Sequence, residues 1–85
     1  MNIKTQKPPV PAGDYLLYHG GHYASYGPRV ERGGIVGPPD GGQEAQFWGV
    51  YTRSKDGERW VWYADVPTRA QAHFAAEAAL FAVLQ

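Results

Sequence analysis

The strongest constraint on the fold is an aromatic β-hairpin that runs directly into an alanine-rich helix. Two stretches rich in aromatic and β-branched residues, 46–53 and 59–65, flank the polar segment 54–58, which contains Asp56-Gly57. Such residues favour a half-buried pleated sheet, and Asp-Gly between two such runs is a strong hairpin signal. The sequence therefore predicts a sheet with a helix packed against it.

A capping box opens the predicted helix at Thr68-Arg69-Ala70-Gln71, directly after Pro67. The Thr68 hydroxyl can accept a hydrogen bond from the backbone N–H of Gln71, and the Gln71 side chain can reach back. Good helix formers, many of them alanine, continue to Leu84. An apolar stripe at helical spacing is expected to pack on the sheet; it contains Phe74, Leu80, Phe81 and Leu84, with Val83 at its edge.

The register of this hairpin decides which of its faces is buried. A two-residue Asp56-Gly57 turn pairs Tyr51 with Trp62, whereas a type I turn with Gly57 in the left-handed region pairs Val50 with Trp62. Serine and glycine at the first and fourth turn positions favour the second register. The core face is then Trp48, Val50, Trp60, Trp62 and Ala64. The second face holds Phe47, Tyr51, Val61 and Tyr63, with Arg53 and Arg59 at its turn end and Gly49 opposite Tyr63.

A first hairpin is predicted around Gly20-Gly21, because a type I′ turn needs positive φ at both central residues. The flanking runs 15–19 and 22–26 are apolar and aromatic. In this register the cross-strand pairs are His19 with His22, Tyr18 with Tyr23, Leu17 with Ala24, and Tyr15 with Tyr26.

These elements predict an α+β fold: a small antiparallel sheet of two hairpins and three to five strands, with one C-terminal helix on one face. The 85 residues are expected to form a Pro-rich N-terminal tail, 1–13, and a single domain, 14–85. Nine of the nineteen residues from 27 to 45 are Gly or Pro, which predicts a mobile loop. Short extended pieces are expected within it at 29–31 and 35–36.

Composition excludes several classes of protein. Eight basic and eight acidic residues cancel, which argues against bulk electrostatic binding to DNA and against an acidic mimic of nucleic acid. The absence of cysteine excludes disulfides and thiolate metal sites. No apolar run resembles a transmembrane helix or a signal peptide, so a cytoplasmic location (the host cytoplasm for a phage-encoded protein) and no membrane partner are expected.

The second face of the aromatic hairpin is the predicted binding surface. Aromatic rings with arginines bind single-stranded nucleic acid by stacking, and they equally form the hot spots of protein interfaces. The loop 27–45 either covers this face as a second small core or contributes to binding. The predicted binding residues are Phe47, Tyr51, Tyr63, Arg53, Arg59, Arg29 and Arg32.

His73 and Glu77 are neighbours on the helix and fall within its apolar stripe. A carboxylate there must be paired or neutral, so Glu77 is expected to bond a tyrosine hydroxyl, a tryptophan N–H or His73; a perturbed acid–base pair is the functional alternative. His19 and His22, facing each other across the first hairpin, could join them in a zinc site. The prediction is that no metal or cofactor is bound, with these four residues as the alternative ligands.

Strands followed by a helix that begins Thr68-Arg69-Ala70-Gln71-Ala72 resemble the first half of the ribonuclease H fold. The resemblance implies a catalytic glutamate on the helix, a position that Glu77 would occupy. That family's first strand carries a catalytic aspartate, whereas the matching stretch here reads Leu17-Tyr18-His19-Gly20-Gly21, and the remaining strands and carboxylates are not present. The expectation is therefore not an active nuclease of this kind.

The functional hypothesis is a small non-catalytic protein that binds a macromolecule through the aromatic hairpin face and the Gly-rich loop. A protein partner is expected, as for an inhibitor or accessory factor of a phage or mobile element, for example an anti-CRISPR or anti-defence protein. The first alternative is a single-stranded nucleic-acid-binding module. The second is a His/Glu metal site or a degenerate ribonuclease H-like enzyme. Both a monomer and a homodimer are compatible with the pattern.

Overall fold

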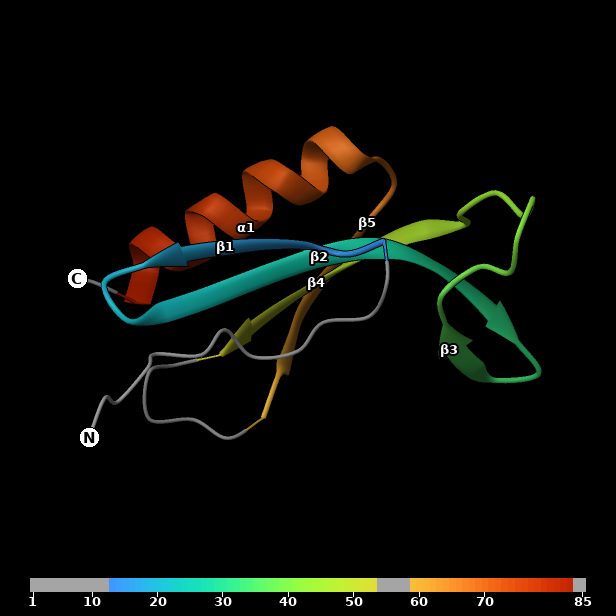
Figure 1. Ribbon diagram of the computed structural model, residues 1–85, viewed down its shortest axis with the longest axis horizontal. Coiled ribbons are helices and arrows are strands. Elements are labelled where there is room, and N and C mark those ends of the chain that lie inside the picture. Colours follow the sequence, from blue (N-terminus) through green and yellow to red (C-terminus); the bar gives the residue numbers. More distant parts are fainter. Residues whose placement is uncertain (1–12, 54–58, 84–85) are drawn as a thin grey trace, which may run out of the picture.

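The computed structural model describes residues 13–53 and 59–83, with only the backbone of Val83. A single antiparallel sheet in the order β1-β2-β4-β5 carries helix α1 on one face, and β3 pairs with the far part of β2 (Figure 1). The elements are β1 Tyr15–His19, β2 His22–Arg32, β3 Ile35–Gly37, β4 Phe47–Arg53, β5 Val61–Val66 and α1 Arg69–Val83. The predicted α+β class is confirmed.

The first hairpin is confirmed in detail. Gly20 and Gly21 have φ of 59° and 87°, as a type I′ turn requires. All four predicted cross-strand pairs are present, from His19 with His22 to Tyr15 with Tyr26. Local turn chemistry therefore fixes the register of β1 on β2.

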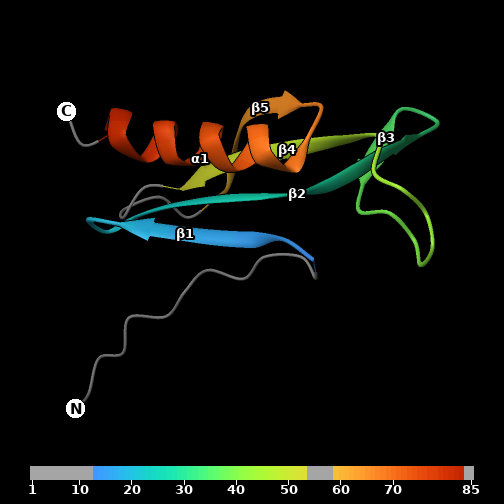
Figure 2. The same cartoon turned by 90° about the horizontal axis from the view of Figure 1, so that it is seen from above.

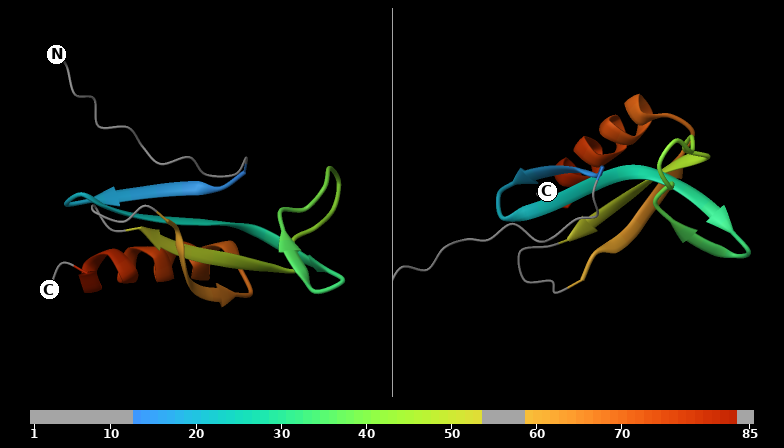
Figure 3. Two further views of the ribbon diagram at one scale, coloured as in Figure 1. Left: turned by 90° about the horizontal axis from the view of Figure 1, so that it is seen from below. Right: turned by 45° about the vertical axis from the view of Figure 1, so that its right-hand side comes forward.

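Strand β2 is the longest strand and organises the sheet. Its first half pairs with β1 on one side, while residues 23–29 pair with β4 on the other. Its last residues leave the main sheet and pair with β3, forming a hairpin arm that projects beyond α1 (Figure 3). The extended pieces predicted at 29–31 and 35–36 thus belong to β2 and β3, and the connection without regular structure is limited to residues 38–46.

The favoured register of the second hairpin is wrong. Tyr51 pairs with Trp62 and Thr52 with Val61, as in the rejected two-residue alternative, and then a bulge shifts the register so that Val50 pairs with Ala64. Tyr63 is the extra residue of this bulge, and Asp65 rather than Tyr63 stands opposite Gly49. The predicted turn at residues 54–58 lies outside the described residues.

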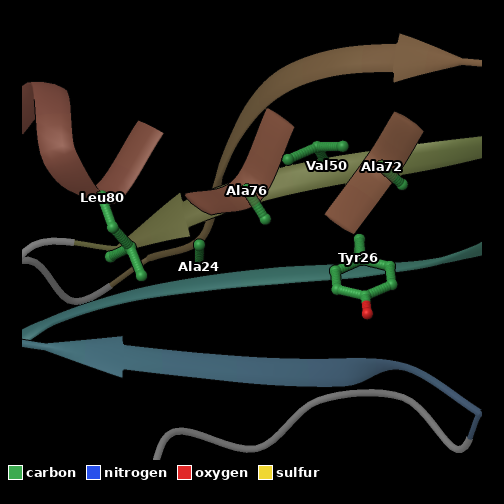
Figure 4. Packing of buried hydrophobic residues seen from close by; sticks show 6 residues of the cluster. All are labelled: Ala24, Tyr26, Val50, Ala72, Ala76 and Leu80. Carbon is green, nitrogen blue, oxygen red and sulfur yellow. The ribbon is translucent and has the colours of Figure 1, made fainter. Parts of the chain in front are cut away.

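Helix α1 packs on β2 and β4 through its smallest side chains. Ala72, Ala76 and Leu80 meet Ala24, Tyr26 and Val50 of the sheet, and Trp48, Ala64 and Val66 border this core (Figure 4). The helix runs roughly along the strands (Figure 2). Alanines at the contact let the two backbones approach closely, because they hold the helix away from the sheet by only one methyl group.

The predicted apolar stripe of the helix is only partly correct. Leu80 is buried, but Phe74 and Phe81 are exposed on the other side of α1, and Leu84 lies outside the described residues. On the sheet, Val50 is buried and Trp48 and Ala64 are partly buried as predicted, whereas Trp62 is exposed because the bulge turns it to the face away from α1. The alanine row, and not the phenylalanines, faces the core.

The capping box is present, but the Gln71 side chain makes a different hydrogen bond from the one predicted. The backbone N–H of Gln71 donates to Thr68 Oγ1 over 3.2 Å, as predicted. The Gln71 side chain does not return to the Thr68 backbone; its Oε1 accepts from the Thr68 hydroxyl over 3.0 Å. Either arrangement stabilises the first turn of α1.

Candidate functional site

Two of the predicted binding residues belong to a buried polar cluster on the face of the sheet away from α1. Arg29 of β2 donates from Nε to the Tyr51 hydroxyl over 3.1 Å. Its Nη1 and Nη2 donate to the two carboxylate oxygens of Asp14 over 2.9 and 2.8 Å. The side chains of Arg29 and Asp14 are only 6% and 1% exposed. Arg29 is therefore a paired internal cation and not a surface contact.

Two glycines make room for this cluster. Gly27 and Gly49 face each other across β2 and β4. A Cβ at Gly27 would overlap the Asp14 carboxylate, and a Cβ at Gly49 would lie 2.7 Å from the Tyr51 hydroxyl. Because neither glycine has a side chain, the Asp14 carboxylate and the Tyr51 hydroxyl can lie directly against the backbone of the two strands. This explains glycine in the middle of two central strands, where it otherwise weakens a sheet.

The polar groups of the cluster satisfy one another. The Asp14 hydrogen bond raises the pKa of Arg29, so this guanidinium stays charged at every relevant pH. Nη1 also donates to the Pro28 carbonyl over 2.8 Å. Asp14, Ser25, Arg29, Tyr51 and Trp60 line a hollow of about 240 Å³ beside the cluster. The hydrogen bonds of the cluster connect Asp14, just before β1, with Arg29 of β2 and Tyr51 of β4, so the cluster holds these strands in position.

The remaining residues of the predicted surface are not brought together around Tyr51. Tyr63 is exposed at the bulge, and Phe47 and Arg53 are partly buried. Arg59 is exposed before β5, and Arg32 lies on the β2–β3 arm, where it pairs with exposed Asp40 over 3.2 Å. The predicted residues are thus distributed over the internal cluster, the two ends of central strand β4, edge strand β5 with the residues before it, and the β2–β3 arm.

A second polar arrangement connects β2 with α1. Nδ1 of His73 lies 2.8 Å from the Tyr26 hydroxyl, and Nε2 of His73 lies 3.1 Å from Glu77 Oε1. The Tyr26 ring stacks on Tyr15 with centroids 4.9 Å apart and meets the His73 ring edge-on. His73 and Glu77 are both about half exposed at the β1 side of the helix, so the prediction that their place between Leu80 and Phe81 directs them at the core is wrong.

When the His73 imidazole is neutral, only one of its two tautomers is compatible with both of these hydrogen bonds. A carboxylate only accepts, so Nε2 carries the proton that bonds Glu77, and Nδ1 accepts from the Tyr26 hydroxyl. The expected pairing of Glu77 with His73 is present. Burial raises the pKa of the Tyr26 hydroxyl above 10.0, with the nearby Arg69 cation opposing the rise. The phenol is therefore held neutral as a hydrogen-bond donor.

The raised pKa of Tyr26 predicts a loss of stability at alkaline pH. The folded state retains the Tyr26 proton to higher pH than the unfolded state, so the stabilisation is complete below pH 10 and is lost as pH rises through the pKa of the folded protein. Urea unfolding of the wild type and Tyr26→Phe from pH 8 to pH 11 measures this. The wild type should lose up to about 1.4 kcal/mol per pH unit relative to the variant above pH 10.

Exposed Tyr63 provides the control for this measurement, because Tyr63→Phe should leave the shape of the pH profile unchanged. A constant difference in unfolding free energy between wild type and Tyr26→Phe over the whole pH range would contradict the assignment.

The histidines of the first hairpin, His19 and His22, face each other as predicted. His19 borders Phe81 with ring centroids 6.1 Å apart, and Nδ1 of His22 is buried without a hydrogen-bond partner in the described structure. Across residues 13–53 and 59–83, no three His, Asp or Glu side chains gather as metal ligands. His73 and Glu77 are paired with each other and Tyr26 instead.

An exposed apolar surface lies on α1, opposite the alanines that contact the sheet. By helical geometry one side of α1 carries Ala70, Gln71, Phe74, Ala78, Phe81 and Ala82, which we call the outer face. Phe74 is 75% exposed and Phe81 is 61% exposed. Surface helices normally present polar and charged residues to water, whereas Gln71 is the one polar member of this face and Glu77 lies at its border beside Phe81. The helix is apolar on both sides and only one side is covered within the described structure.

Several residues of these sites were not found from the sequence. Asp14 stands alone before the first strand, and nothing in its spacing indicates Arg29 as its partner. Gly27 and Gly49 were the available signal, since glycine inside a strand indicates a close approach. The outer face does not follow from the sequence pattern, because helical spacing places Phe74 and Phe81 in the stripe expected to pack on the sheet.

Comparisons with protein-family models, curated proteins and solved structures found no match for this chain. The resemblance of the Thr68–Ala72 helix start to ribonuclease H is thus not supported by any match. Within the described residues, no helix has both the length and the hydropathy needed to span a membrane.

Proposed function

We propose that this chain is a non-catalytic protein-binding module and that the outer face of α1 is its contact surface. The observation that carries the proposal is the exposure of Phe74 and Phe81 on a helix that already buries its opposite side. Phe74, Ala78 and Phe81 follow the i, i+4, i+7 spacing by which an amphipathic helix inserts into an apolar groove of a partner. Large exposed apolar side chains of this kind mark interaction sites.

The chemistry of this surface favours a protein over a nucleic acid. Nucleic-acid binding needs cations directed at phosphates, and the outer face has none. Of the rings predicted to stack on bases, Tyr51 is less available than expected, because it accepts a hydrogen bond from Arg29 inside the buried cluster, whereas Tyr63 is exposed. The complementary partner surface is therefore an uncharged groove. The more specific hypothesis of a phage-type inhibitor stays a prediction.

Edge strand β5 carries another set of exposed apolar side chains, from the predicted hairpin. Val61 and Trp62 are exposed there beside Tyr63. Trp62 is held by a hydrogen bond from its indole N–H to Asp65 over 2.9 Å. This surface is secondary in the proposal, because it retains polar partners of its own.

Affinity capture with three baits tests the proposal: the wild type, Phe74→Ser and Ile35→Ser. Ile35 on the β3 arm is also 75% exposed, so its substitution removes a matched apolar side chain from another surface. One protein in stoichiometric amount should be retained by the wild type and by Ile35→Ser and lost with Phe74→Ser. Circular dichroism verifies that each bait is folded.

Three other results of this capture experiment would point to a different contact surface or a different partner. Retention of the same protein by Phe74→Ser would remove the outer face from the proposal. Captured nucleic acid in place of protein would favour the stacking alternative. Sedimentation velocity of the bait itself identifies the remaining case, in which a second copy of the chain covers the outer face and Phe74→Ser gives a monomer.

A further inference from the structure

A separate pocket opens beside the first turn of α1, between the helix and β1. Tyr15, Tyr26, Arg69, Ala70 and His73 line it, and its volume is about 450 Å³. In Figure 4 the hydroxyl of Tyr26 points away from Ala72 and toward the side on which β1 lies. The pocket lies on the β1 side of the helix and shares only the methyl group of Ala70 with the outer face. It is therefore a second feature, independent of the proposed protein contact.

The pocket contains Arg69, a cation that forms no ion pair with any residue in the described ranges. Arg69 donates from Nη1 to the Tyr15 hydroxyl over 3.1 Å and lies 5.5 Å from the centre of the Tyr15 ring. No carboxylate of the described residues comes within ion-pairing distance of it, in contrast to Arg29 and Arg32. Most of its N–H groups are thus available, and a guanidinium presents them as a planar fork that matches oxyanions.

The neighbouring side chains hold this fork in place and supply a second donor. Tyr15 is supported from below by its stack on Tyr26, and Tyr26 is fixed by its bond to His73. Since the Tyr15 oxygen accepts from Arg69, its own proton is free to donate into the pocket. A charged donor and a neutral donor therefore converge on one hollow with aromatic walls.

We propose that this pocket binds the phosphate group of a small phosphate-containing molecule, with Arg69 as its charged ligand and the Tyr15 hydroxyl as its neutral one. The volume exceeds what the anion itself needs, so the aromatic walls can contact the group that carries the phosphate. Tyr26 and His73 are positioning residues, because their hydrogen bonds are made to each other and to Glu77.

An NMR titration of the full chain tests the proposal. Phenyl phosphate, inorganic phosphate and benzoate are added separately, and the chemical shifts of the backbone amides are recorded. Both phosphates should shift the amides of Ala70 and His73. Tighter binding of phenyl phosphate assigns a phosphate ester, whereas equal binding assigns free phosphate. Arg69→Gln should weaken the binding at least about tenfold, which corresponds to the loss of one charge-assisted pair.

Arg59→Gln is the matched control, because Arg59 is an exposed arginine that does not line the pocket and precedes β5, whereas Arg69 follows it, and the substitution changes the net charge equally. It should leave the affinity within about twofold, as expected for a charge that acts only through screened solvent. Tyr15→Phe keeps the ring stack and should weaken binding severalfold, so it tests the site even where Arg69→Gln disturbs the helix. Absence of shifts at about 10 mM phosphate, equal weakening by Arg59→Gln, or benzoate binding as tightly as phenyl phosphate would overturn the proposal.

Discussion

Asp14→Ala should lower the free energy of unfolding by about 3–5 kcal/mol, because it leaves the buried Arg29 guanidinium without its carboxylate. Both side chains are almost fully buried, and the pair is bidentate. Removing one partner of such a pair strands a charge away from water, which costs more than the pair itself contributes. Urea unfolding at neutral pH, followed by circular dichroism, measures the loss.

Two variants make this measurement specific. Asp40→Ala removes an exposed Asp–Arg pair, in which the Asp40 side chain is 85% exposed, and should change the stability by at most about 1 kcal/mol. Asp14→Ala combined with Arg29→Met removes the stranded charge and should recover much of the lost stability. A loss of the same size for Asp40→Ala and Asp14→Ala would contradict the account of a buried pair.

Gly27→Ala should destabilise the fold by about 2–4 kcal/mol, although it adds only a methyl group. The new Cβ would overlap the Asp14 carboxylate and lie 2.8 Å from Arg29 Nη1, so the ion pair has to move off the sheet. Because the neighbour is a buried charged group held from several directions, it cannot shift at low cost. The midpoint of urea unfolding reports the change.

Gly41→Ala is the matched control, since a Cβ at Gly41 meets no atom within 4 Å and the backbone there does not need glycine. Its effect should stay within about 0.5 kcal/mol. Gly27→Ala should also become milder in an Asp14→Ala background, where the methyl group has less to displace. Additive effects of the two substitutions would show that Gly27 is required for another reason.

The parts of the fold that sequence predicted well depend on local chemistry. Gly20-Gly21 determines a type I′ turn by its backbone freedom alone, and Thr68 and Gln71 cap the helix within one turn. The register of the second hairpin depends instead on a bulge at Tyr63, which turn composition does not reveal. A bulge is selected by how a whole strand fits its neighbours, so the local preference for a type I turn was a poor guide.

The orientation of α1 shows a limit of hydrophobic periodicity. Both sides of the helix are apolar, so spacing alone does not tell which side meets the sheet. Size decides it: Ala72 and Ala76 allow close packing over Tyr26 and Val50, whereas phenylalanine at those contacts would hold the helix away. The larger residues then remain outside, where the fold itself does not use them.

For the candidate sites, the sequence indicates which types of residue are involved but not how they are arranged in space. His73 and Glu77 were correctly paired from their helical spacing, but the contact with Tyr26 joins residues 47 positions apart. Asp14 and Arg29 meet only because β1 and β2 fold onto one sheet. Long-range contacts between polar side chains follow from strand order and register, which one sequence does not specify.

The most direct test of the protein-binding proposal is the equilibrium dissociation constant of the captured partner, purified, for the wild type, Phe74→Ser and Ile35→Ser. A buried aromatic hot spot contributes about 2 kcal/mol or more, so Phe74→Ser should weaken binding at least about 30-fold while Ile35→Ser stays within about twofold. Equal affinities for the wild type and Phe74→Ser, or equal weakening by both substitutions, would contradict the outer face of α1 as the binding surface.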